Sequence, residues 1–357
     1  MKQRNYPAIE KLVSILSDVM PVRFLKDSDL LHELASRWSE RQRFWHGPEH
    51  LLTLIREVML SVSGLDREVL LLAALYHDAV YCPRGAGNEE ASARLLRSHA
   101  ADESDPVVRQ ACNVILASDW ATIPESKLGR LFFEMDTRQL SDACPLGERL
   151  AYERAIFREY QWAPWPEYRE KRVAFLRMWG ERFPSHRSGT NECVALLDAL
   201  NPRVAVYPGS FNPFHDGHLS VLRQAELAFE KVIIAVGVNR QKTTAVESLD
   251  QRHAELRAQL HYHEVAIFPG LLSGFLNSME LPVTVVRGVR DGTDLEAELR
   301  FARFLNELRA NTAVVWMGCE PEFQHVSSSA IRELEALEPG AGARYVPTRP
   351  AIYGSVA

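Results

Sequence analysis

Two histidines near the middle of the chain are placed where they could bind phosphate groups. The segment Val204–Leu219 reads VAVYPGSFNPFHDGHL and carries His215 and His218. An apolar, β-branched run precedes its glycine-containing turn, and a segment with helical periodicity follows. A strand, a turn and a helix in this order direct backbone N–H groups beyond the strand end, where a helix start favours negative charge. Because two imidazoles there can donate hydrogen bonds to phosphate oxygens, the segment predicts a nucleoside triphosphate site.

A second set of residues with metal-ligand chemistry lies in the first half of the chain. His77 and Asp78 lie near the end of an apolar helical run, LLLAALYHDAVY, where a buried charge must be paired or bound to a metal. His50 lies at the start of another helix, and Asp136 lies among apolar residues in LFFEMD. Three helices could bring these side chains to one divalent cation. Imidazoles with carboxylates suit Mn²⁺, Fe²⁺, Co²⁺, Ni²⁺ or Zn²⁺ better than Ca²⁺.

The elements that must position these residues change character near Asn201-Pro202. Before it, apolar residues recur every three or four positions, so residues 1–200 predict an all-helical domain. After it, β-branched runs alternate with helical segments, which predicts a Rossmann-like α/β domain with a parallel sheet over residues 203–357. The expected strands are 203–208, 231–238, 264–269, 283–287 and 312–317, and the expected helices are 217–230, 249–260, 294–309 and 328–336.

Polar clusters follow four of these strands. Open parallel sheets bind ligands beyond the carboxyl ends of their strands, so these clusters are expected to meet at one edge. Their imidazole, ammonium, guanidinium and hydroxyl groups all suit phosphate. The clusters are the 210–218 loop, Asn239 to Lys242, Arg287 to Arg290, and Ser327 to Ser329.

The composition of the 357 residues is that of an ordinary globular protein, with 46% hydrophobic and 25% charged residues. A net charge of −6 gives no electrostatic case for nucleic acid as a partner. The sequence shows no apolar run of membrane-spanning length and no secretion signal at its start, so we expect no membrane association and a cytoplasmic location. Five scattered cysteines suit a reducing compartment. Small molecules are the expected partners, and association of identical chains stays open.

The second half of the chain resembles the phosphopantetheine adenylyltransferase family, within the nucleotidyltransferases marked by a His/Thr-x-Gly-His loop. The resemblance rests on four motifs: PGSFNPFHDGHL, AVGVNRQK, VRGVRDGTDLEAEL and EFQHVSSSAIREL. It implies transfer of adenylate from ATP to a phosphomonoester, with 4′-phosphopantetheine the favoured acceptor, in coenzyme A biosynthesis. Mg²⁺ would accompany the ATP.

The resemblance also implies roles for individual residues. His218 would stabilise the transition state at the ATP phosphates, and Lys242 and Arg287 would hold the acceptor phosphate. The remaining substrate- and ATP-binding residues would be Ser210, Phe211, His215, Arg290, Glu298, Ser327, Ser328 and Ser329.

The acceptor stays open because the sequence departs from the family pattern. His215 and the ending SSSAIRE are typical of nicotinate-nucleotide relatives, and the asparagine expected after the acidic residue comes one place late, at Asn306. A nicotinate- or nicotinamide-mononucleotide adenylyltransferase is therefore an alternative. A nucleotide-sensing regulator, in which one or both sites bind without turnover, is another.

The first half resembles the HD superfamily of metal-dependent phosphohydrolases, over most of residues 20–200. The motifs are FWHGPEHLLTLI, LAALYHDAVYCPRGAGNEEASA and EMDTRQL. The resemblance implies that His50, His77, Asp78 and Asp136 bind the metal, that His46 lines the site, and that residues 88–90 lie near its mouth. Taken singly, His50 could instead be a core histidine and Asp136 a helix cap. Relatives often carry a further histidine where this chain has Ala117 to Trp120, so hydrolysis could be weak.

Overall fold

The computed structural model describes residues 6–237 and 249–347, and its contacts divide the chain into two compact units. The first contains the described residues up to Glu159 and the segment Arg172–Leu197. The second contains Tyr160–Lys171 and the described residues from Asp198 onward. The domain boundary near residues 201–202 stays a prediction. Residues 160–171, which precede that boundary, pack with the second unit.

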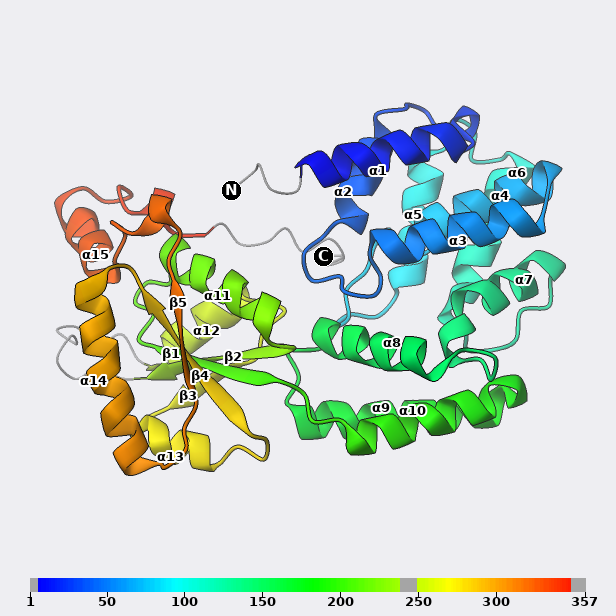
Figure 1. The fold of residues 1–357 in the computed structure, drawn as a ribbon. Helices are drawn as coiled ribbons and strands as arrows, with labels where there is room; N and C mark the ends of the chain where they lie inside the picture. Colours follow the sequence, from blue (N-terminus) through cyan, green and yellow to red (C-terminus); the bar gives the residue numbers. More distant parts are fainter. Residues whose placement is uncertain (1–5, 238–248, 348–357) are drawn as a thin grey trace. The chain divides into compact units, whose positions relative to one another are not determined.

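The first unit is helical, as the sequence predicts (Figure 1). α4 (Gly64–Tyr76) is its central helix, because every residue from Val69 to Tyr76 is buried. This burial explains the continuous apolar run and brings His77, at the end of α4, into the interior. The other helices are α1 (Tyr6–Val19), α2 (Leu30–Trp38), α3 (Pro48–Ser61), α5 (Asn88–His99), α6 (Pro106–Leu116), α7 (Lys127–Asp136), α8 (Leu146–Glu159), α9 (Trp165–Arg182) and α10 (Arg187–Ala199), of which α9 begins among residues of the second unit.

The second unit is an α/β domain built on a five-stranded parallel sheet, which confirms the prediction (Figure 1). The strand order is β3-β2-β1-β4-β5. The strands are β1 (Val204–Gly209), β2 (Lys231–Gly237), β3 (Val265–Phe268), β4 (Val283–Val289) and β5 (Val314–Gly318). The helices are α11 (Asp216–Ala228), α12 (Leu249–Gln259), α13 (Leu272–Asn277), α14 (Gly292–Leu308) and α15 (Ser328–Leu337).

Helices cover both faces of the sheet, which is why β1 and β2 are almost entirely apolar, with Lys231 at the start of β2 as the charged exception. Ala205 and Tyr207 face a core formed with α11 and α12. Val204 and Val206 face the opposite core, formed with α13 and α14. The sequence analysis missed α13, because six residues are too few to show a helical period.

Residues 160–171 are fixed to the second unit through a buried lysine. Lys231, at the start of β2, is 1% exposed. Its Nζ donates to the carbonyl oxygens of Gln161 and Ala163, both at 2.5 Å, and forms an ion pair with Glu264 at 2.7 Å. Burial lowers the pKa of the ammonium group, and Glu264 opposes that shift. Since a buried charge needs such partners, these contacts integrate the segment into the α/β domain.

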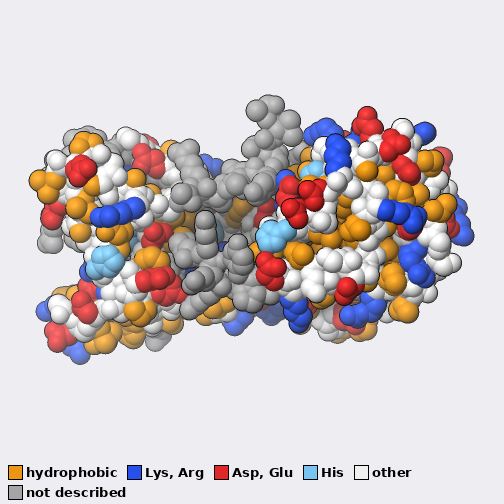
Figure 2. Space-filling view, turned by 90° about the horizontal axis from the view of Figure 1, so that it is seen from above, with side chains coloured by type: hydrophobic (Ala, Val, Ile, Leu, Met, Phe, Trp, Pro, Cys, Tyr) orange, Lys and Arg blue, Asp and Glu red, His pale blue; other side chains and the backbone are white. Residues whose placement is uncertain are grey.

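The surface in the view of Figure 2 carries Lys and Arg interspersed with Asp and Glu. Within residues 6–237 and 249–347, no helix combines the length and apolarity that a membrane span requires.

Candidate functional site

The sheet order reverses its direction between β1 and β4. From β1 the chain winds outward through β2 and β3, and it then returns to place β4 on the other side of β1 (Figure 1). Open α/β sheets bind ligands beyond the strand ends at this reversal. The structure places there several residues predicted to contact phosphate: Ser210, Phe211, His215 and His218 after β1, and Arg287 and Arg290 at the end of β4. Lys242 lies outside the described residues.

The loop after β1 is shaped by a buried aromatic ring. Phe211 has a left-handed φ of +45° and is 3% exposed. Its ring lies so close to Gly209 that a Cβ there would approach it to 2.7 Å. The ring also meets that of His218 edge-on, with centroids 5.1 Å apart. The Phe211 side chain therefore supports His218, and its part in substrate binding stays a prediction.

His215 and His218 form a stacked pair at the start of α11. Their ring centroids lie 3.7 Å apart, and the backbone N–H of His215 donates to Nδ1 of His218 at 3.3 Å. This bond makes Nδ1 an acceptor, so a neutral His218 carries its proton on Nε2. Gly217 allows the stack, because a Cβ there would lie 3.0 Å from the His215 ring. His218 is half-buried, and the proton of its neutral ring points from the side opposite to this bond.

His215 is 5% exposed, and its Nδ1 has no hydrogen-bond partner among the described residues. Burial and the charge of Arg290 lower the pKa of His215 to about 4. The imidazole is therefore neutral at physiological pH, which keeps a second positive charge away from Arg290.

The pKa of His215 predicts acid sensitivity of the second unit. Because the folded pKa is about 4 and the ordinary value is 6.5, the unfolded chain binds more protons between these values. Stability should fall as the pH drops from 6.5 to 4, by up to about 3 kcal/mol. Hydrogen exchange of β1 and β2 peptides should show smaller acid destabilisation in His215→Asn than in the wild type. Equal acid destabilisation in both proteins would contradict a lowered pKa of His215 in the folded protein.

Arg287 and Arg290 are each paired with a carboxylate on α14. Arg287 makes two bonds to Glu298, at 2.6 and 2.7 Å, and donates to the carbonyl oxygen of Pro208 at 2.9 Å. Arg290 makes two bonds to Asp294, at 2.6 and 2.9 Å. The sequence analysis assigned Arg287 and Glu298 to different substrates, whereas the structure brings them together. Each guanidinium is thus oriented at the strand end.

The serine segment is tied to the loop after β1. Ser327 caps α15 by accepting from the N–H of Ala330, and Ser328 Oγ donates to the carbonyl oxygen of Pro213 at 3.0 Å. Arg332 extends this link, because it donates to Ser329 Oγ at 3.2 Å and to the carbonyl oxygen of Asn212.

Two arginines were not singled out by the sequence analysis. Arg332 lies within the SSSAIREL motif, which was a usable signal. Arg252, on α12, is 6% exposed and donates to the carbonyl oxygen of Ser210 at 3.1 Å. No motif marks Arg252, so only the fold reveals that it supports the loop.

Comparison with known proteins identifies this domain. The family described as Cytidylyltransferase-like matches residues 206–334. The chain is 34% identical over 137 residues to a phosphopantetheine adenylyltransferase of Clostridium perfringens strain SM101, covering 38% of this chain and 83% of that protein. It is 36% identical over 134 residues to the phosphopantetheine adenylyltransferase of Clostridium beijerinckii, covering 37% of this chain and 84% of that protein. The chain belongs to the phosphopantetheine adenylyltransferase family.

The family match covers the residues at the carboxyl ends of β1 and β4. The match from 206 to 334 includes the ends of β1 and β4, the paired histidines and the serine segment. The aligned stretch makes up most of the length of the phosphopantetheine adenylyltransferase relatives. In this chain it makes up little more than a third of the length.

Outside the phosphopantetheine adenylyltransferase domain, the first unit brings all four predicted metal ligands together. His50 lies on α3, His77 and Asp78 follow α4, and Asp136 ends α7. One ligand atom from each of His50, His77 and Asp78 lies within 4.8 Å of the others. Asp136 Oδ1 lies 3.1 Å from Nε2 of His50 and 3.4 Å from Nε2 of His77.

The ligand atoms are oriented by contacts behind them. Nδ1 of His77 lies 3.0 Å from the carbonyl oxygen of Ala74, so it carries the proton and leaves Nε2 facing the cluster. The indole N–H of Trp120 donates to Asp136 Oδ2 at 3.0 Å. Such partners are usual behind metal ligands. The Trp120 indole thus contacts the cluster directly.

The electrostatics of the cluster suit a cation. Burial opposes ionisation of Asp78 and Asp136, but the neighbouring imidazoles outweigh it and lower both pKa values. Burial also opposes protonation of His77, yet the two carboxylates raise its pKa well above the ordinary value. The cluster therefore concentrates negative charge that a proton on His77 partly balances. Its donor set of imidazole nitrogens and carboxylate oxygens fits a divalent transition metal.

His46 lies beside the cluster and is held by a buried carboxylate. Its Nδ1 is 2.6 Å from Glu159 Oε2, which also accepts from the hydroxyl of Tyr81 at 2.7 Å. Glu159 Oε1 accepts the backbone N–H groups of residues 44–46. Arg43 adds a bond to the carbonyl oxygen of Asp78 at 2.6 Å. The sequence analysis found His46, but it found neither Glu159 nor Arg43, which no local motif marks.

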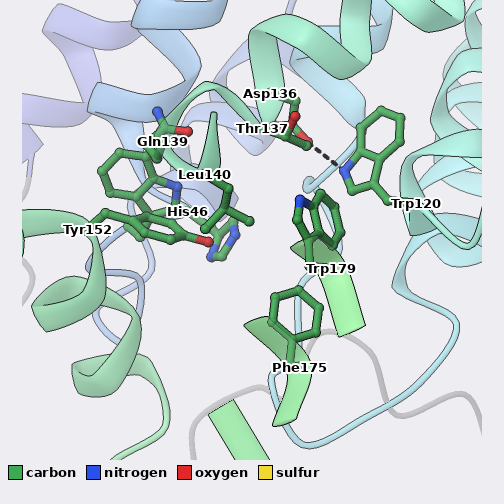
Figure 3. Close-up of a pocket in the computed structure, with 10 residues that line it drawn as sticks. His46, Trp120, Asp136, Thr137, Gln139, Leu140, Tyr152, Phe175 and Trp179 are labelled. Carbon is green, nitrogen blue, oxygen red and sulfur yellow. Dashed lines mark hydrogen bonds between the residues drawn. The ribbon is translucent and has the colours of Figure 1, made fainter. Parts of the chain in front are cut away.

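A cavity opens beside this cluster (Figure 3). It contains about 410 Å³ of free space, part of which is open to solvent. Asp136 and His46 line it together with aromatic side chains, among them Trp45, Trp120, Tyr152 and Trp179. Asn88 closes a turn through two bonds to the backbone of Cys82, and burial together with the charge of nearby Asp78 raises the pKa of Glu89. The place of residues 88–90 near the mouth of the site stays a prediction.

Proposed function

We propose that the second unit transfers adenylate from ATP to a phosphomonoester, with 4′-phosphopantetheine as the favoured acceptor. The observation that carries the proposal is the joint placement of His218, Arg287 and the serine segment at the carboxyl ends of β1 and β4, in a domain whose relatives are named phosphopantetheine adenylyltransferase.

The chemistry requires positioning rather than a strong base. The acceptor phosphate is already an anion and attacks the α-phosphorus of ATP, and pyrophosphate leaves. Catalysis must bring two anions together and neutralise the developing charge. Nε2–H of His218 would donate to the reacting phosphate, while Arg287 and Lys242 would hold the acceptor phosphate. Ser210, Arg290, Glu298 and the serine segment would bind ATP, and Mg²⁺ bound with ATP would neutralise its phosphates.

The acceptor preference is testable by competition. Phosphopantetheine should exceed nicotinate mononucleotide in kcat/KM, and pantetheine without phosphate should not react, because the cationic groups would have no anion to hold. Initial rates of pyrophosphate release with each acceptor measure this. A higher kcat/KM for nicotinate mononucleotide would favour the alternative raised by His215 and SSSAIRE. ATP binding without turnover on any acceptor would favour the regulator.

We propose as a second function that the first unit is an HD-type metal-dependent phosphohydrolase. The convergence of His50, His77, Asp78 and Asp136 beside an open cavity favours it. These four residues would hold the cation, which would lower the pKa of a coordinated water and make it a nucleophile for a phosphate ester. His46 would contact the substrate in the cavity, fixed by its bond to Glu159.

A further inference from the structure

Trp120 has a backbone conformation that is costly for a bulky residue. Its φ is +49°, in the left-handed region that few residues other than glycine adopt. Such strain persists only where the surroundings hold it in place. The carbonyl oxygen of Trp120 accepts from Arg182 at 3.1 Å, and the buried indole meets the ring of Phe133 edge-on, with centroids 5.2 Å apart. The Trp120 side chain is therefore held in one direction.

That direction is toward a predicted metal ligand. Figure 3 shows the indole of Trp120 aimed at Asp136, and its N–H donates to Oδ2 at 3.0 Å. The other oxygen, Oδ1, lies 3.1 Å from Nε2 of His50 and 3.4 Å from Nε2 of His77. Among the residues that the structure describes, Trp120 alone donates to Oδ2. The two oxygens of Asp136 thus face different partners.

The indole cannot itself serve as a metal ligand. Its N–H is a donor only, whereas a neutral imidazole also offers a lone pair. Because the indole occupies Oδ2, Asp136 is left with Oδ1 for a cation. Together with Oδ2 of Asp78 and Nε2 of both histidines, the cluster then offers four ligand atoms. A catalytic cation needs positions that the protein leaves open, and an octahedral ion such as Mn²⁺ would keep about two here.

We propose that Trp120 is a positioning residue that limits Asp136 to ligation through one oxygen and so keeps a coordination position open for water or a phosphate oxygen. The inference rests on the proposed metal-dependent function of the first unit. It adds that an indole in contact with the carboxylate, and not with the cation, sets how many positions stay open. Without the indole, Oδ2 is free to turn toward the cation and to displace a water.

Water-proton relaxation of the Mn²⁺ complex counts the exchangeable waters on the cation without any turnover. The full chain, saturated with Mn²⁺ in the absence of nucleotide, should show about two such waters, because the protein fills the other octahedral positions. Trp120→Phe keeps an aromatic ring and removes the N–H, so the number should fall by about half. Trp316→Phe, the same change on β5 of the other unit, is the matched control and should give the wild-type relaxation.

Two further variants separate this role from an effect on folding. Arg182→Met, at an exposed position, removes the bond to the Trp120 carbonyl oxygen and should lower the number of waters in the same direction. In the double variant Trp120→Phe with Asp136→Asn, the amide nitrogen cannot bind the cation, so the lost water should return.

The relaxation of Trp120→Phe decides the question if this variant is folded by circular dichroism, and that of Arg182→Met decides it otherwise. Unchanged relaxation in the deciding variant at equal metal content would overturn the inference, and so would a fall that Asp136→Asn does not reverse. A wild type that binds no Mn²⁺ would contradict the metal site itself, and with it the role of Trp120.

Discussion

Replacing His218 with alanine should lower kcat for adenylyl transfer by about 10²- to 10³-fold, the usual cost of removing one preorganised donor to developing charge. The stack with His215 and the bond to its backbone N–H fix the ring so that Nε2–H is the donor. KM for ATP should change much less, because the lost contact is strongest in the transition state. Steady-state pyrophosphate release measures both constants.

The matched control for this variant is His261→Ala, which removes an imidazole from the same unit at a position after α12. It should retain wild-type kcat. Circular dichroism should show that both variants are folded. A folded His218→Ala protein with near-normal kcat would refute the role of the paired histidines.

Replacing Asp78 with alanine should remove the metal from the first unit and abolish hydrolysis of phosphomonoesters. Asp78 Oδ2 lies 3.1 Å from Nε2 of His77, and its loss deprives the cluster of a carboxylate. The first unit should also lose the stabilisation that a bound ligand provides, about 3 kcal/mol at a metal concentration 100-fold above its dissociation constant. Elemental analysis after mild chelation and re-addition of Mn²⁺ gives the metal content directly.

Adenylyl transfer should survive this substitution, because its residues lie in the other unit. Asp18→Ala, at an exposed position on α1, is the control and should keep its metal. If Asp78→Ala and the wild type hold the same amount of metal, the histidines and carboxylates form only a buried ionic cluster.

The sequence predicted those features that depend on local pattern. The alternation of β-branched runs and helical periods predicted the parallel sheet, and the apolar run before His77 reflects the burial of every residue from Val69 to Tyr76 on α4. The strand order could not be predicted, because β4 pairs with β1 across nearly 80 residues of chain. Contacts of this kind leave no periodic signal.

The site residues show the same division. Histidines and aspartates in unusual apolar surroundings were found, and the structure brings the four predicted metal ligands together. Glu159 escaped notice because ordinary helices contain many glutamates. Its importance lies in the five hydrogen bonds that its carboxylate makes to residues 44–46 and Tyr81. Arg287 and Glu298 were assigned separately because their ion pair depends on the packing of α14 against β4.

Phosphorus NMR of the wild-type protein with ATP, 4′-phosphopantetheine and Mg²⁺ tests the proposed adenylyl transfer most directly. The acceptor phosphate and the α-phosphorus of ATP should give the paired signals of a new phosphoanhydride, while pyrophosphate appears in equal amount. The mass of the phosphoanhydride product should equal that of phosphopantetheine joined to adenylate. Release of inorganic phosphate alone, or an acceptor signal that stays unchanged while ATP is consumed, would contradict adenylyl transfer to this acceptor.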